Sequence, residues 1–285
     1  MLAEKLLQWY ARNSPIHKGK YPLVERYWER AIGPGSKRRT AKLTAGGFEM
    51  ECDLNFVLQR QFYFFGTYYL ERENLACWEA HSKNAKVIFD VGANLGIYSL
   101  CATAISPKAR IYSFEPTPSL VSHLKQTLTY NKITQVEVIQ NAVSCISGQA
   151  SLNFCGGVEV GNEGMNFVTL RARSPEAISI ETITLDDFCS KRAIEQIDLL
   201  KIDIQGNEPA ALDGAARLLD ERRIRCIFTE LNWATDPGQP CSASELIETL
   251  KSKGFLFALP IRGAKVRQAG DWMRGLDDVV AILPE

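Results

Sequence analysis

Short apolar runs alternate with amphipathic stretches along most of the chain, and this alternation predicts its elements. Five runs rich in β-branched residues are typical of strands buried in a parallel sheet. They are Val87–Val91, Arg110–Glu115, Val136–Gln140, Asp198–Ile204 and Ile224–Leu231. Helical spacing of apolar residues follows from Ile97 to just before Pro107, over 119–130 and over 242–253. Strands separated by helices in this way predict an α/β fold with a mostly parallel sheet.

Other strands fall outside this regular alternation. Phe255–Leu259 and Val279–Leu283 are predicted to be strands near the end of the chain. Strands at 151–155, 167–170 and 178–183 surround a Gly- and Asn-rich loop at 156–166. That loop is either a mobile cover for a bound molecule or an ordinary surface turn.

The first 82 residues have a different pattern, and we expect them to form an N-terminal extension to a domain over residues 83–285. Helices are predicted over 2–12 and 22–32, and a β-hairpin around a Gly-Gly turn over 41–54. An aromatic segment at 62–69 and a helix over 71–81 follow. The helices either pack on their own domain or form a lid or the interface of a homodimer. The aromatic segment either lines the mouth of a substrate site or fills core.

Composition excludes several classes of protein. The 285 residues carry 33 basic and 33 acidic side chains, so the chain has no overall charge with which to bind nucleic acid or an anionic membrane. Eight cysteines without a Cys-x-x-Cys pair fit reduced core thiols, and three histidines make a structural zinc site improbable. The N-terminus does not resemble a signal peptide, and no apolar stretch is long enough to span a bilayer. We therefore expect a cytoplasmic protein with neither a membrane nor a nucleic acid as its partner.

The strongest local signal for a ligand is the turn after Val87–Val91, which contains Asp90, Gly92, Asn94 and Gly96. A strand, a glycine-bracketed turn and a helix begin the nucleotide-binding unit of doubly wound folds. The spacing Asp-x-Gly-x-x-x-Gly is neither the dinucleotide pattern nor a phosphate loop. A carboxylate at the strand end repels pyrophosphate but attracts a cation, and S-adenosylmethionine carries two positive groups and no phosphate. Alternatively, Asp90 only caps the turn.

Polar residues at the ends of the later strands extend this candidate site. Glu115 ends the second strand, where an acid can accept hydrogen bonds from a ribose diol. Asn141 ends the third strand and either meets an adenine edge or caps the strand. Asp203 ends the fourth strand beside the predicted crevice, and Glu230 ends the fifth. Because acids at apolar strand ends are costly unless they are paired or used, we expect both to be functional.

Three more residues are candidates for contacting the substrate. Glu208 begins the helix after the fourth strand, where a carboxylate suits the positive end of the helix dipole. Asn232 and Trp233 follow the fifth strand at the same edge of the sheet.

Four segments together resemble the FkbM family of S-adenosylmethionine-dependent methyltransferases. They are Asp90-Val-Gly-Ala-Asn-x-Gly96, Phe114-Glu115-Pro116, Thr184-Leu185-Asp186-Asp187 and Leu200-Lys-Ile-Asp-Ile-Gln-Gly-Asn-Glu208, within a match over roughly residues 40–283. The resemblance implies a Rossmann-like class I methyltransferase sandwich. Its mostly parallel seven-stranded sheet has an antiparallel last strand and helices on both faces.

The resemblance also implies a function. Family members mostly methylate hydroxyls of sugars, polyketides and other secondary metabolites. Tyr68 lies in a segment, Tyr68-Tyr69-Leu70-Glu71, that loosely matches the Gly-x-Tyr-Glu of the family, and is a candidate cofactor contact. The family often has Glu where this chain has Gln205.

For methyl transfer to a hydroxyl of a small molecule, we expect in-line geometry and a general base. Asp203 is the first candidate for that base and Glu230 the second. A divalent metal is a less favoured alternative, in which Asp203, Glu230 and Asn232 would bind Mg²⁺. RNA or another macromolecule is the alternative acceptor, although the fourth strand has no Asn/Asp-Pro-Pro-aromatic segment and no Pro-Cys pair. A nicotinamide-dependent oxidoreductase is a third reading of the fold.

Overall fold

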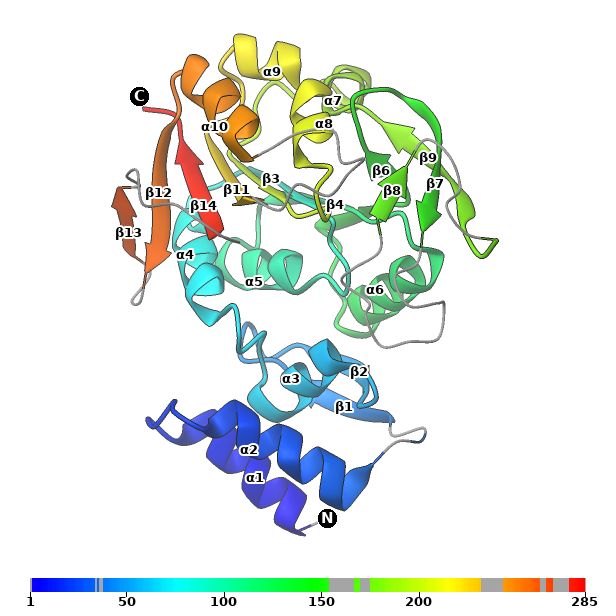
Figure 1. Ribbon diagram of the computed structural model, residues 1–285, viewed down its shortest axis with the longest axis vertical. Helices are drawn as coiled ribbons and strands as arrows, with labels where there is room; N and C mark the ends of the chain where they lie inside the picture. The colour runs from blue at the N-terminus through cyan, green and yellow to red at the C-terminus, as the bar shows by residue number, and fades with distance from the viewer. Residues whose placement is uncertain are drawn as a thin grey trace.

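The central feature of the computed structural model is an eight-stranded sheet in the order β13-β12-β14-β11-β10-β3-β4-β5 (Figure 1). The structure describes residues 2–33, 35, 38–153, 167–169, 175–231, 243–261, 265–268 and 277–284. The strands are β3 (Val87–Val91), β4 (Arg110–Phe114), β5 (Val136–Ile139), β10 (Leu199–Ile202), β11 (Cys226–Leu231), β12 (Leu256–Ile261), β13 (Lys265–Gln268) and β14 (Asp277–Ile282).

The pairing of the strands confirms the predicted topology. β5, β4, β3, β10 and β11 are parallel neighbours, and β14 inserts antiparallel between β11 and β12. These strands form the predicted seven-stranded sheet with its antiparallel last strand. β13 adds an eighth strand by pairing antiparallel with the outer edge of β12, and the sequence reading did not include it.

Helices cover both faces of this sheet (Figure 1). One face carries α4 (Arg72–Ser82), α5 (Ile97–Ile105) and α6 (Pro118–Tyr130). The other carries α7 (Leu185–Arg192), α8 (Glu208–Asp213), α9 (Ala216–Asp220) and α10 (Ala243–Ser252). Each face has its own hydrophobic core, with Leu100 and Leu124 in one cluster and Phe188 and Leu246 in the other. This arrangement leaves the carboxyl ends of the parallel strands free to build a site.

A separate four-stranded sheet, β6-β9-β7-β8, lies beside the main one. Its strands are β6 (Ala142–Val143), β7 (Gly148–Asn153), β8 (Phe167–Thr169) and β9 (Ile178–Ile183). The sequence pattern predicted most of these strands but not that they form a second sheet. The loop predicted at 156–166 lies outside the described residues.

The N-terminal module comprises α1 (Leu2–Asn13), α2 (Lys20–Tyr27), a π-helical turn (Trp28–Ile32), the hairpin β1 (Arg38–Lys42) and β2 (Glu49–Asp53), and α3 (Val57–Phe65). Arg12 anchors α1 by donating to the carbonyl oxygens of Lys42 and Tyr63, each at 2.7 Å. One hydrophobic cluster runs from Ala11 through Phe62 to the sheet. α4 packs against α5 and β12 rather than against this module. The domain boundary at residue 82 stays a prediction.

Two further expectations concern the oxidation state of the cysteines and the presence of membrane-spanning helices. The six described cysteines, Cys52, Cys77, Cys101, Cys145, Cys189 and Cys226, are free thiols, and all but Cys145 are buried. Among the helices of the described ranges, none has both the length and the apolar character needed to cross a bilayer.

Candidate active site

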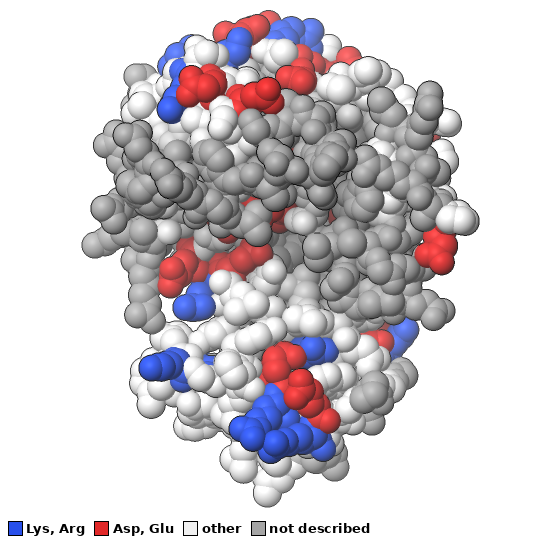
Figure 2. All heavy atoms as spheres, in the orientation of Figure 1, with Lys and Arg blue, Asp and Glu red and all other residues white. Residues whose placement is uncertain are grey.

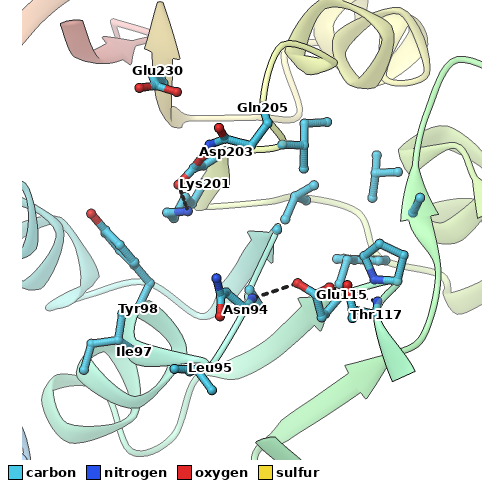
Figure 3. Close-up of a pocket in the computed structure, with 18 of the residues that line it drawn as sticks. Asn94, Leu95, Ile97, Tyr98, Glu115, Thr117, Lys201, Asp203, Gln205 and Glu230 are labelled. Atoms are coloured by element: carbon cyan, nitrogen blue, oxygen red, sulfur yellow. Dashed lines mark hydrogen bonds and ion pairs between the residues drawn. The ribbon is translucent and has the colours of Figure 1, made fainter. Parts of the chain in front are cut away.

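A cavity of about 330 Å³ opens where the carboxyl ends of β3, β4, β10 and β11 meet (Figure 3). Leu58 and Phe62 of α3 close it on the side of the N-terminal module, and Leu152 and Val168 of the second sheet close another side. The cavity brings together seven of the residues singled out in the sequence. These are Tyr68, Gly92, Asn94, Glu115, Asn141, Asp203 and Glu230.

The other candidates are placed differently. Asp90, Gly96 and Glu208 are not among the residues that line the cavity. Asn232 and Trp233 lie outside the described residues, so their predicted contact with substrate stays a prediction. The aromatic segment serves both of its expected purposes, because Phe62 and Tyr68 line the cavity while Phe64 is fully buried.

Only glycine fits at position 92, because the backbone at the end of β3 lies very close to the backbone at the end of β10. Its φ is 77°, and a Cβ at this position would lie 2.0 Å from the backbone oxygen of Asp203. Any side chain would therefore force β3 and β10 apart at the floor of the cavity. Gly96 has a φ of 79°, and its Cβ would lie 2.3 Å from Leu124 Cδ1, so this glycine seats α5 against α6.

Asp90 lies beneath the glycine turn and is completely buried. Its Oδ2 accepts hydrogen bonds from the backbone nitrogen of Ser99 at 3.1 Å and from Ser99 Oγ at 2.7 Å. Oδ1 is buried without a hydrogen-bond partner in the described part of the chain. Burial raises the pKa of this carboxyl, while Lys201 and the Ser99 hydrogen bonds lower it. Asp90 thus ties β3 to the first turn of α5, and it supports the cavity from below rather than lining it.

Glu115 lines the cavity next to the glycine turn. Its carboxylate accepts hydrogen bonds from the backbone nitrogens of Asn94 and Thr117, each at 2.9 Å (Figure 3). Burial raises the pKa of Glu115, and the hydrogen bonds from Thr117 and Asn94 lower it. Asn141 lines the same end and donates to Glu181 at 3.5 Å. The cavity lining therefore includes an oriented acid, Glu115, and an amide, Asn141.

An ion pair between the buried Lys201 and the partly exposed Asp203 occupies the other end of the cavity. Lys201 Nζ lies 3.0 Å from Asp203 Oδ2 and 4.6 Å from the centre of the Tyr98 ring. Gln205 donates from Nε2 to Asp203 Oδ1 at 3.0 Å. Burial lowers the pKa of Lys201, but the carboxylates of Asp203, Asp90 and Glu71 raise it by more, so the net direction is upward. Asp203 is therefore held by two donors.

Glu230 lies across from this ion pair (Figure 3). Its carboxylate makes no hydrogen bond or ion pair with any described residue. Burial raises the pKa of Glu230 to about 7, and the nearby acids Asp203 and Asp278 add to the shift. A carboxylate that titrates near neutral pH is well matched to accepting a proton.

Two further acids line the cavity: Glu71, to which the sequence reasoning gave no role of its own, and Asp278, which it missed. Tyr98 donates to Glu71 at 2.6 Å, and burial raises the pKa of Glu71 to about 7 although that hydrogen bond and Lys201 lower it. Asp278 is directly opposite Glu230 in the antiparallel pairing of β11 and β14. Glu71 could have been suspected because it directly precedes α4 in the segment that holds Tyr68. No local pattern marks Asp278.

Glu208 has a structural position. It is 2% exposed, and its Oε1 accepts a hydrogen bond from the backbone nitrogen of Ile204 at 2.9 Å. The side chain therefore stabilises the turn that follows β10. Because Glu208 does not line the cavity, its predicted contact with substrate finds no support in this geometry.

The charges of the cavity are strongly unbalanced. Its described lining includes five carboxylates, those of Glu71, Glu115, Asp203, Glu230 and Asp278, and one cation, Lys201. Figure 2 shows acidic side chains gathered in the recess between the main body and the N-terminal module. Among the described residues, no group of three or more His, Cys, Asp and Glu is arranged to hold a metal. The Mg²⁺ hypothesis, which needs Asn232, stays untested.

Comparisons with known proteins show which family the chain resembles. The family model described as the methyltransferase FkbM domain matches residues 90–257, which is more than half of the chain. The chain is 28% identical to the 2-O-methyltransferase NoeI of Sinorhizobium fredii over 155 residues. That match covers 50% of this chain and 62% of NoeI, so the chain spans less than two thirds of that relative.

Two other relatives are similarly distant. The chain is 26% identical to the 31-O-demethyl-FK506 methyltransferase FkbM of Streptomyces tacrolimicus, over 59% of this chain and 72% of that protein. It is 24% identical to the hexuronic acid methyltransferase AglP of Haloferax volcanii, over 53% of this chain and 58% of that protein. Among solved structures, an O-methyltransferase from Bacillus cereus aligns with 98% of this chain and 97% of its own, at 14% identity and a TM-score of 0.45. That structural similarity is too weak to support an argument.

Proposed function

The chain belongs to the FkbM methyltransferase family, and from this premise we propose that it transfers a methyl group from S-adenosylmethionine to a hydroxyl of a small molecule. The observation that carries the proposal is a single cavity with two chemically different ends. A glycine turn and Glu115 form one end, while Asp203 and Glu230 form the other.

The residues of the first end fit S-adenosylmethionine. Gly92 keeps the turn free of side chains, and the Glu115 carboxylate, fixed by two backbone amides, can accept hydrogen bonds from a ribose diol. The buried Asp90 Oδ1 lies below the turn without a partner among the described residues, which suits a nearby positive charge. Five carboxylates against one cation in the described lining disfavour a pyrophosphate, which a nicotinamide cofactor would bring. Asn141 and Tyr68 would complete the binding surface.

The bound cofactor supplies an activated methyl group on a sulfonium. The task of the protein is then to align the acceptor, exclude water and remove the hydroxyl proton. We propose Glu230 as the general base, because its carboxylate has no competing partner in the described chain and its pKa is raised to about 7. Asp203, which the sequence favoured for this role, is held by Lys201 and Gln205. We assign it the orientation of the acceptor hydroxyl.

The class of acceptor is proposed from the family and from the charges. NoeI, AglP and the FkbM protein are named for a 2-O-methylation, a hexuronic acid and a demethyl-FK506, respectively. A hydroxyl of a sugar, a polyketide or a related secondary metabolite is the corresponding acceptor for this chain. The acidic lining disfavours a polyanion such as RNA, because phosphates would approach the carboxylates of Asp203, Glu230 and Asp278.

Methyl transfer from labelled S-adenosylmethionine to a panel of sugars, macrolides and phenols tests the proposal. We expect one class of hydroxyl compound to be labelled. Glu230→Gln should lower kcat by about two orders of magnitude or more while S-adenosylhomocysteine still binds. Cofactor binding without labelling of any compound in the panel would instead point to a macromolecular acceptor. Unchanged kcat in Glu230→Gln would remove the assignment of the base.

A further inference from the structure

The N-terminal module exposes an unusual number of large apolar side chains. Leu2, Leu6, Trp9, Ile16 and Leu23 are 75%, 59%, 64%, 61% and 45% exposed. They are five of the eleven exposed large hydrophobic residues in the described chain, and all five lie within its first 23 residues. We call these five residues the N-terminal apolar face. Single exposed apolar residues need no explanation, but a concentration of them marks a surface that another body covers.

The geometry of α1 brings three residues of this face into one stripe. At about 100° per residue, Leu2, Leu6 and Trp9 fall within an arc of roughly 60° on the helix. Glu4 and Ala11 point the opposite way and are buried. Glu4 is fixed there, since Tyr63 donates to its carboxylate at 2.9 Å. The inner side of α1 is therefore committed to α3, and its outer side presents the apolar stripe together with the polar side chains of Lys5 and Asn13.

Unpaired cations accompany each part of the face. Lys5 lies between Leu2 and Trp9 on α1, Lys18 follows Ile16 in the connecting turn, and Arg26 follows Leu23 on α2. All three cations are exposed, and none makes an ion pair within the described residues. Other surface cations do pair, as Arg38 with Glu51 and Arg192 with Glu137 show.

The charge of this segment differs from that of the whole chain. Residues 2–32 contain six Lys and Arg against three Glu, a net charge of +3 in a chain whose formal charge is zero. Two of the three acids are neutralised internally, Glu4 by Arg39 and Glu25 by Arg60. Figure 2 shows Lys and Arg side chains on the module, with Asp and Glu side chains directly beside them. The balanced overall charge, from which the sequence excluded a membrane partner, conceals this local excess.

Charge complementarity selects the partner. A second copy of the chain, docked on this face by a two-fold axis, would bring two surfaces of the same positive charge together, which disfavours a dimer here. Anionic lipid head groups would instead attract all three cations. Leu and Trp side chains on the outer side of a surface helix are suited to insertion at the boundary between head groups and acyl chains.

We propose that the N-terminal apolar face, with Lys5, Lys18 and Arg26 around it, docks the protein onto an anionic lipid surface. Docking is peripheral, because the inner sides of α1 and α2 stay packed on the protein. It requires no methyl transfer and is independent of the proposed function.

Flotation with vesicles of phosphatidylcholine alone and of phosphatidylcholine mixed with phosphatidylglycerol tests this proposal. We expect the full chain to float with the mixed vesicles only, and to be released as salt is raised. The charge-reversal variant Lys5→Glu/Lys18→Glu/Arg26→Glu should bind at least about a hundredfold more weakly, from roughly fivefold per cation removed near the surface. Leu6→Ser/Trp9→Ser should also lose binding, by about tenfold or more.

Matched controls separate docking from misfolding and from self-association. Ile146→Ser/Leu256→Ser removes two apolar side chains of similar exposure, 65% and 58%, from other surfaces and should float like the parent. Retained affinity for S-adenosylhomocysteine would show that each variant is folded. Failure of the parent to float, or equal binding to both kinds of vesicle, would overturn the proposal. A parent that is dimeric by sedimentation, and that Leu6→Ser/Trp9→Ser converts to a monomer without any vesicle binding, would assign the face to a second copy instead.

Discussion

Replacing Glu230 by Gln is expected to stabilise the protein at alkaline pH while it removes the proposed base. In the folded protein, burial and the nearby acids raise the pKa of Glu230 from 4.5 to about 7. The folded carboxyl therefore keeps its proton up to about pH 7, whereas the unfolded chain releases it near pH 4.5. Stability consequently falls as the pH rises between these two values, and the full cost is present above pH 7. Gln carries no such cost because it does not ionise.

The pKa difference sets the size of the effect. About 2.5 pKa units correspond to at most about 3.4 kcal/mol, at ~1.36 kcal/mol per unit. The side chain is only partly buried, and solvent screening reduces this value, so we expect a gain of about 1–2 kcal/mol in the free energy of unfolding. Urea denaturation of the parent and of Glu230→Gln at about pH 4 and about pH 8 measures the difference.

The comparison has a clear control. Glu248→Gln changes a carboxylate whose side chain is 75% exposed, and its free energy of unfolding should stay within about 0.5 kcal/mol of the parent at both pH values. A stabilisation by Glu230→Gln that is equal at both pH values would refute the reasoning from burial. Destabilisation at about pH 8 would show that the carboxylate has a favourable partner.

Three other substitutions probe the remaining parts of the cavity. Gly92→Ala should abolish detectable binding of S-adenosylhomocysteine in calorimetry, because the added Cβ would lie 2.0 Å from the backbone oxygen of Asp203. Binding like that of the parent would show that β3 and β10 can separate freely. Asp90→Ala should weaken the binding of S-adenosylhomocysteine by about tenfold to a hundredfold while the circular dichroism spectrum remains native. Unaltered affinity would show that Asp90 has only a structural role. Asp278→Asn should lower the apparent pKa of the base in a kcat/KM–pH profile, since it removes a negative charge opposite Glu230. An unchanged profile would show that Asp278 does not affect the pKa of the base.

Local sequence pattern was sufficient for the parts of the fold that a single segment determines. The strand Val87–Val91 was predicted to the residue, since four apolar positions and Asp90 are followed directly by the glycine turn. The N-terminus of α7, a helix that was not predicted, also has a local signal, since Thr184 Oγ1 accepts a hydrogen bond from the Asp187 backbone nitrogen. By contrast, the separate sheet of β6–β9 depends on which strands pair, and alternation does not specify that.

The candidate site shows the same limit. Glu115, Asp203 and Glu230 were foreseen because parallel strands bring their carboxyl ends to one edge of the sheet. Asp278 was not, because it enters the cavity only through the antiparallel insertion of β14 beside β11. The sequence also did not show which side chains bind the Asp203 carboxylate. Only the fold shows Lys201 and Gln205 bonded to that carboxylate, and Glu230 without a hydrogen-bond or ion-pair partner among the described residues.

The central claim is that the cavity at the ends of β3, β4, β10 and β11 binds S-adenosylmethionine. Isothermal titration of the parent chain with S-adenosylhomocysteine, and separately with NAD, tests it most directly. We predict one saturable site for S-adenosylhomocysteine, lost in Gly92→Ala, and no measurable heat with NAD. Binding of NAD without binding of S-adenosylhomocysteine would contradict the claim.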